Sequence, residues 1–137
     1  YSSVDDGAAN IENLGTNVKT PLYTQMIWNQ NTIKRDSDTF VARAGMKALG
    51  GKFGIAYNYS DLGATALPSV TGLNFGSGEY SELDLTYKVK VFDGSTTLFA
   101  GYVYQNDQRD AKVVDGIAID ATDVDQNMLR FWARYNF

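Results

Sequence analysis

Cysteine and histidine are both absent from this chain of 137 residues, and each absence removes a class of site. Without cysteine, the chain has neither a disulfide framework nor a thiolate that acts as nucleophile or metal ligand. Without histidine, it holds no Ser-His-Asp triad, no Cys-His pair and no usual histidine-based metal centre. Other residue types remain open for a hydrolase, but no catalytic group stands out, so we expect a protein that is not an enzyme.

Proline and long hydrophobic runs are also scarce. The chain has two prolines, thirteen glycines and nine tyrosines. This composition favours long strands with tight turns over long helices. The mean hydropathy is −0.28, and no apolar run approaches the ~18–20 residues of a membrane-spanning helix. This excludes helical spans only, because alternating barrel strands average to a polar composition. The net charge of −4 and the pI near 4.6 argue against a nucleic-acid partner.

Alternation of apolar and polar residues predicts the strands. It is clearest at the end of the chain, where Leu129, Phe131, Ala133, Tyr135 and Phe137 alternate with a polar, basic face. None of the residues on the predicted apolar faces is charged. The predicted strands are 39–47, 52–60, 80–92, 96–105 and 128–137, with a weaker candidate at 21–28.

Short and long connections alternate between the predicted strands. Gly50-Gly51 and Asp93-Gly94 indicate tight turns, whereas long polar stretches occupy 61–79 and 106–126. Outer-membrane barrels have short periplasmic turns and long extracellular loops. With a periplasmic C-terminus, the strand at 39–47 runs down and its neighbours alternate in direction.

The same parity makes predictions for the first 38 residues. Residues 1–38 are expected to be mostly extracellular: 4–38 form one long loop in which 21–28 does not span, and Tyr1-Ser2-Ser3 end a preceding upward strand. Residues 39–137 then form five antiparallel strands. The fold class predicted is all-β, an antiparallel transmembrane β-barrel. Because about 8 strands are the minimum for closure, we expect residues 1–137 to be the C-terminal portion of one larger barrel domain.

The polar faces of these strands gather basic residues, and we predict that they line a pore. Two acids, Glu82 and Asp84, are on the same face and nearer the outer rim. A basic track lowers the electrostatic cost of an anion in a narrow aqueous lumen. The alternative is that these charges are simply solvated or paired with one another. The predicted basic pore-lining residues are Arg43, Lys47, Lys88, Lys90, Arg130 and Arg134.

Two sets of residues resemble known membrane proteins. Tyr135 and Phe137 resemble the aromatic-x-Phe end of the C-terminal assembly signal of bacterial outer-membrane β-barrels. Longer stretches resemble, in the same order, the C-terminal third of the OprD-type substrate-specific porins and the related major porins of epsilonproteobacteria. Those stretches are TPLYTQMIWNQN, FVARAGMKALGGKFGIAYNYSDLG, EYSELDLTYKVK, GSTTLFAGYVYQN and DVDQNMLRFWARYNF.

The resemblance implies a barrel of about 18 strands in the bacterial outer membrane. Such a porin is a water-filled channel for passive diffusion of ions and small hydrophilic solutes, here with a preference for anionic or carboxylate-bearing ones. Its partners are outer-membrane lipid and lipopolysaccharide, the barrel-assembly machinery and the solutes. The sequence does not decide whether three copies form a homotrimer. The family often has a lumenal basic ladder, and the resemblance makes five residues here candidates for its rungs: Arg43, Lys88, Lys90, Arg130 and Arg134.

Other interpretations remain open. A soluble β-sandwich that binds ligands through its loops and tyrosines is distinguished by detergent dependence. An envelope scaffold or adhesin barrel is distinguished by single-channel conductance. Asp120, Asp123 and Asp125 are candidate ligands for Ca²⁺, which prefers hard oxygen donors, although their spacing does not fit an EF-hand loop. The alternative is an acidic loop that is only solvated, and no other cofactor is expected.

Overall fold

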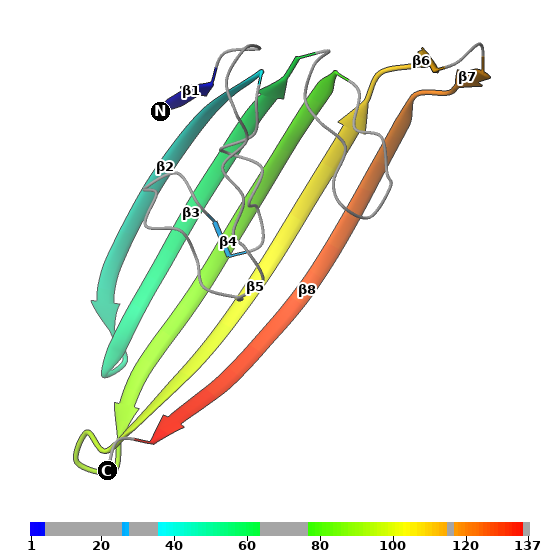
Figure 1. The fold of residues 1–137 in the computed structure, drawn as a ribbon. Helices are drawn as coiled ribbons and strands as arrows, with labels where there is room; N and C mark the ends of the chain where they lie inside the picture. The colour runs from blue at the N-terminus through cyan, green and yellow to red at the C-terminus, as the bar shows by residue number, and fades with distance from the viewer. Residues whose placement is uncertain (5–25, 28–35, 64–76, 115–116, 136–137) are drawn as a thin grey trace.

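The computed structural model describes residues 1–4, 26–27, 36–63, 77–114 and 117–135 (Figure 1). Within these ranges the chain is all-β and contains no helix, and therefore none long and apolar enough to span a membrane. A six-stranded antiparallel sheet has the order β1-β2-β3-β4-β5-β8, and β6 pairs with β7 apart from it. The strands are β1 (Ser2–Val4), β2 (Ser37–Ala48), β3 (Gly51–Leu62), β4 (Gly78–Val91), β5 (Thr96–Arg109), β6 (Lys112–Val114), β7 (Ile117–Ile119) and β8 (Thr122–Tyr135).

The five long strands match the five predicted from alternation, but most extend further than predicted. β5 continues to Arg109 and β8 begins at Thr122, so much of the predicted loop at 106–126 is paired backbone. The prediction ended where alternation ends, yet polar side chains sustain the pairing: the Asn106 amide donates to the Asp123 carboxylate at 2.8 Å. In the sequence, the short β6–β7 hairpin connects β5 to β8.

The N-terminal predictions are only partly covered by the described residues. β1 runs antiparallel to β2, as expected for Tyr1-Ser2-Ser3. Residues 26–27, from the weak strand candidate at 21–28, are not in a strand. Most of the predicted loop at 4–38, and Phe137, lie outside the described residues.

Two tight turns lie together at one end of the sheet, which we call the turn end (bottom in Figure 1); the other end is the loop end. Leu49 and Gly50 form the first turn with φ values of 51° and 74°. The sequence placed this turn one residue late, at Gly50-Gly51, whereas Gly51 already pairs with Ala48 in the ladder. Positive φ at both central residues matches the twist of the flanking strands, and the exposed Leu49 adopts it at a cost.

Leu49→Asn should therefore stabilise the folded protein. Asparagine tolerates the left-handed region, in which an ordinary side chain costs about 1–2 kcal/mol. Leu49 is 84 % exposed, so the exchange removes little packing. We expect a gain of about 1 kcal/mol in the free energy of unfolding, measured by urea titration of the whole protein. Leu49→Ala is the control, because it keeps a Cβ at positive φ; an equal gain in that variant would contradict the explanation.

The second turn is formed by residues 92–95, between β4 and β5. The Gly94 amide donates to the Val91 carbonyl at 3.2 Å, and the Ser95 amide donates to the Phe92 carbonyl at 3.0 Å. Phe92, Asp93 and Gly94 all have positive φ. The predicted turn at Asp93-Gly94 is thus confirmed.

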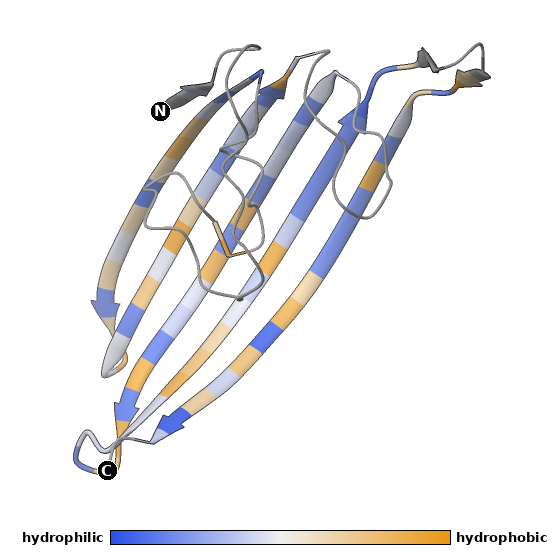
Figure 2. Ribbon diagram, viewed as in Figure 1, coloured by the Kyte–Doolittle hydropathy of each residue, from blue (hydrophilic) through white to orange (hydrophobic). Residues whose placement is uncertain are grey.

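The register gives the sheet an apolar face and a polar face. Directly opposed residues share a face, and Figure 2 shows the resulting bands along the strands. One transverse row of the apolar face is Ala44, Ile55, Leu85, Tyr102 and Leu129. The adjacent row of the polar face is Arg43, Ala56, Asp84, Val103 and Met128.

The buried residues lie on the polar face, and the apolar face is open. On the polar face Glu82 is fully buried, whereas Leu85 and Phe131 on the apolar face are 42 % and 70 % exposed. Hydroxyl and amide groups pair within the buried part: the Thr39 and Ser60 hydroxyls lie 2.9 Å apart, and the Ser60 hydroxyl donates to the Asn58 side-chain oxygen at 3.3 Å. This is the reverse of a soluble sheet, whose apolar face packs on a core.

Candidate functional site

Three lysines stand side by side on the polar face near the turn end. Lys47 is opposed to Lys52, and Lys52 is opposed to Lys88, across β2, β3 and β4. We call these three residues the lysine row. Opposed side chains on neighbouring strands have Cβ atoms about 4.5–5.5 Å apart. All three lysines are exposed, so the row presents three ammonium groups from three adjacent strands to its surroundings.

More cations flank the lysine row on the same face. Lys90 and Arg134 are each opposed to Thr97 in the next row toward the turn end, and Arg130 is opposed to Gly101 on the loop side. We call the six cations the basic zone. Within the described parts of the chain, none of the six forms an ion pair. The basic zone comprises Lys47, Lys52, Lys88, Lys90, Arg130 and Arg134.

Two aromatic rings continue the lysine row across the sheet. Phe99 follows Lys88 in the register and Trp132 follows Phe99; their rings are stacked with centroids 5.1 Å apart and planes 9° apart. The Lys88 Nζ lies 5.9 Å from the Trp132 ring centroid and the Arg134 Cζ lies 5.7 Å from it, within cation–π range. Gly101 permits the position of Phe99, because a Cβ there would lie 2.9 Å from the ring.

The acids on the polar face lie nearer the loop end and are buried. The Tyr80 hydroxyl donates to the Glu82 carboxylate at 2.9 Å, and the Ile27 amide donates to Asp84 Oδ2 at 2.9 Å. Arg43 Nη2 lies 3.8 Å from the Met26 sulfur. Residues 26–27 therefore rest on the polar face, and Figure 1 shows them in front of β4. Residues 26–27 thus cover this face at Asp84.

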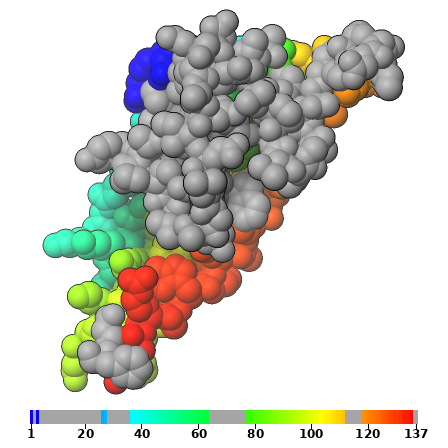
Figure 3. Space-filling model, viewed as in Figure 1, coloured from blue at the N-terminus to red at the C-terminus, as the bar shows by residue number. Residues whose placement is uncertain are grey.

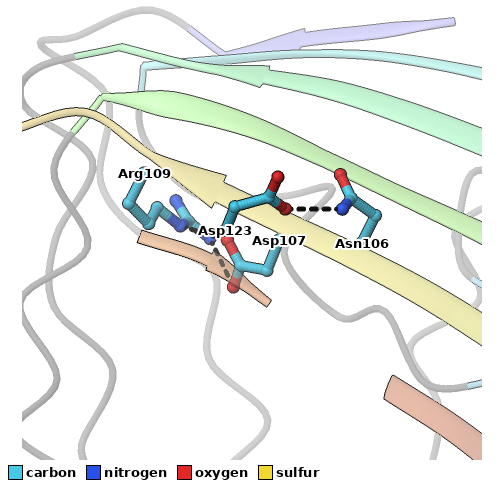
Figure 4. Close-up of polar contacts among 4 residues, drawn as sticks. All are labelled: Asn106, Asp107, Arg109 and Asp123. Carbon is cyan, nitrogen blue, oxygen red and sulfur yellow. Dashed lines mark hydrogen bonds and ion pairs between the residues drawn. The ribbon is translucent and has the colours of Figure 1, made fainter. Parts of the chain in front are cut away.

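Polar contacts continue to the loop end of β5 and β8 (Figure 4). Arg109 forms an ion pair with Asp107 through its Nε, and its Nη2 donates to Asp107 Oδ2 at 3.2 Å. Asn106 Nδ2 donates to the carboxylates of Asp123 and Asp125 at 2.8 and 2.9 Å. The Asn106 hydrogen bonds hold the two strand ends together beyond the alternating segments, and the Arg109–Asp107 pair lies within β5.

Of the three predicted calcium ligands, two lie beside Asn106: Asp123 and Asp125. The third, Asp120, is exposed in the connection before β8. In the described parts of the chain, no group of three or more acidic side chains is arranged to hold a metal ion. Calcium binding stays a prediction without a built site.

The predicted pore-lining residues all share the polar face, but they divide into two environments. Arg43 and the predicted cations near the turn end are exposed, whereas Glu82 and Asp84 are buried. Lys52 is not among the predicted pore-lining residues, although its place immediately before Phe53 in an alternating strand assigns it to the polar face. The Phe99–Trp132 pair is likewise absent from the predictions.

Of the predicted assembly signal, Tyr135 is described: it is 59 % exposed and lies at the turn end of the apolar face. A second aromatic feature lies nearby on this face, where the rings of Phe53 and Tyr87 have centroids 4.4 Å apart. The Tyr87 hydroxyl donates to the Leu49 carbonyl at 2.7 Å. Aromatic side chains therefore gather at the turn end of the apolar face.

Comparison of the chain with protein-family models, with curated proteins and with solved structures found no match.

Proposed function

We propose that this chain is part of an outer-membrane β-barrel porin whose polar face lines a water-filled channel for ions and small hydrophilic solutes. The observation that carries the proposal is the reversed burial of the sheet: Leu85 and Phe131 are exposed while Glu82 and Asn58 are buried. Exposed apolar surface of this extent is unfavourable in water, but it is stable against lipid hydrocarbon. An uncharged outer band and a polar interior are the pattern of membrane barrels.

The open edges of the sheet support a larger barrel. Among the described residues, β8 pairs along 14 residues with β5 and with no strand on its other edge. β2 likewise pairs with β1 only over Ser37–Thr39. Unpaired backbone groups in hydrocarbon each cost several kcal/mol, so further strands must satisfy both edges. About 18 strands in total, as in the porins that the sequence resembles, would leave an aqueous channel.

The basic zone supports a preference for anions. Six cations project from the exposed part of the polar face, while the acids of that face are buried and hydrogen-bonded. Fixed positive charge beside a narrow aqueous path attracts anions and carboxylate-bearing solutes and repels cations. Acids at the loop end lie farther from the basic zone than the screening length of about 8 Å at physiological salt, so they weaken its attraction for anions little.

The rival interpretations differ from the porin in properties that are easy to measure. A soluble β-sandwich would leave the exposed apolar face without a cover, and it would not need detergent. A scaffold or adhesin barrel has the same strands but does not conduct. Outer-membrane location, the assembly machinery as a partner and lipopolysaccharide contact all follow from the porin proposal.

Single cysteines provide the direct test, because this chain has none of its own. In the whole protein reconstituted in a planar bilayer, Lys52→Cys should react with a water-soluble anionic methanethiosulfonate reagent. The reaction adds a negative group beside the channel, so the conductance to KCl should fall. The matched variant is Leu85→Cys on the apolar face, whose conductance should not change.

Four outcomes separate the alternatives. A protein that conducts but does not respond at Lys52→Cys places the channel elsewhere and contradicts the lining assignment. A response at Leu85→Cys would mean that the apolar face contacts water. Absence of conductance from a properly inserted protein would favour the scaffold, and release from membranes without detergent would favour the soluble module.

A further inference from the structure

We propose that the lysine row of Lys47, Lys52 and Lys88 is a binding site for a multiply charged oxyanion, with inorganic phosphate as its simplest member. This inference deepens the proposed porin function and rests on it. A general anion preference requires only scattered positive charge. The lysine row is more specific, because the register opposes three like charges on three adjacent strands.

Direct opposition of like charges destabilises a sheet. A sequence that breaks such a local rule does so most often at a functional site. Here no described residue offsets the repulsion with a negative charge: the nearest acid of the same face, Asp84, is four residues back along β4 and bonds the Ile27 amide. Lys88 reduces the repulsion only by approaching Trp132. A bound dianion would offset most of it.

The geometry of the row favours a divalent anion with several acceptor oxygens. Ammonium groups on adjacent strands, each with three donors, can surround one phosphate or sulfate and bond different oxygens of it. The Coulomb attraction doubles for a dianion relative to a carboxylate, because it scales with the product of the charges. A singly charged carboxylate has only two oxygens and cannot satisfy three lysines as well.

The surroundings leave room for such an anion. Next to Lys47 and Lys52 on the polar face, Gly45 is opposed to Gly54, and neither glycine adds a side chain there. All three lysines are exposed rather than covered by chain. In Figure 3, atoms of the turn-end halves of β2, β4 and β8 are open to view. The row is thus accessible from the side that we assign to the channel.

The test is block of KCl current through the whole protein in a planar bilayer by added phosphate at pH 7.5. Phosphate and sulfate should block at concentrations at least about tenfold lower than acetate does, because of their second charge. Lys52→Gln removes the central ammonium and should raise the half-blocking phosphate concentration about tenfold. Lys90→Gln is the matched control: it is the same change on the same face, about 7 Å along β4 from Lys88, and should raise that concentration about twofold at most.

Two outcomes overturn the site while leaving the porin intact. One is a conducting, anion-preferring channel that phosphate blocks no better than acetate does. The other is an equal effect of Lys52→Gln and Lys90→Gln, which would indicate a diffuse field instead of a site at the lysine row.

Calorimetric titration of the detergent-solubilised protein with phosphate keeps the two proposals separate. Phosphate binding that Lys52→Gln weakens, in a protein that does not conduct, would support the site and reject the porin. Absence of binding heat together with absence of block would reject the site.

Discussion

Leu85→Arg should prevent stable assembly of the protein in membranes. Leu85 lies in the middle of β4, on the apolar face, with Ile55 and Tyr102 opposed to it on either side. An arginine on the lipid face of a barrel at mid-depth costs roughly 2–4 kcal/mol, a large share of the stability of an ordinary domain. We expect a loss of this size in urea unfolding from lipid vesicles and a lower yield of inserted protein.

Thr86→Arg is the matched control for this prediction. Thr86 follows Leu85 directly in β4, but the register assigns it to the polar face, opposed to Gly54 and Gly101. An arginine there projects into the proposed channel and should cost under about 1 kcal/mol, since its charge stays hydrated. Equal losses in the two variants, or none in either, would show that the apolar face does not contact hydrocarbon.

Reversing two charges of the lysine row should convert the channel from anion preference to cation preference. One unit charge at 8 Å contributes about 0.5 kcal/mol in water, so the four units changed in Lys52→Glu/Lys88→Glu give about 2 kcal/mol before screening. Salt reduces this, and we expect the cation-to-anion permeability ratio to rise about tenfold. The measurement is the reversal potential under a KCl gradient.

Asp123→Lys/Asp125→Lys provides the comparison, because it also changes four units of charge. Asp125 and Asp123 lie on β8 about 24 and about 31 Å from the level of the lysine row, given about 3.4 Å per residue. At these distances salt screens the interaction almost completely, so the permeability ratio should stay near that of the parent. Because the register assigns both aspartates to the apolar face, a larger effect from them than from the lysines would contradict the assignment of the polar face to the channel.

The strands and the two faces could be predicted from the sequence because the side-chain period of a strand is two. The spacing of Phe53, Ile55 and Tyr57 alone assigns them to one face, without reference to the neighbouring strands. The loop ends of the strands could not be predicted in this way. Asn106 and Asp123 are polar and belong to no apolar alternation, and only the cross-strand hydrogen bond between them reveals that the ladder continues.

The candidate site depended on information that alternation does not contain. A period of two assigns Lys47, Lys52 and Lys88 to one face, but only the register makes them direct neighbours. The buried Asp84 accepts a hydrogen bond from the amide of Ile27, which is 57 residues away in the sequence. Contacts of this kind come from the path of a loop over the sheet, and local pattern cannot specify that path.

The sheet order has a consequence for how the protein is built. In the main sheet, each strand from β1 to β5 pairs with the next along the chain, and β8 follows β5 across the small β6–β7 hairpin. No crossover must be threaded, and the two-residue turn closes the β2–β3 hairpin with little loss of loop entropy. Each hairpin can form locally and then offer its edge to the next, so the sheet can grow by sequential addition instead of a single long-range search. Rapid formation is favoured where contacts are local, which limits how long an open strand edge is exposed to aggregation.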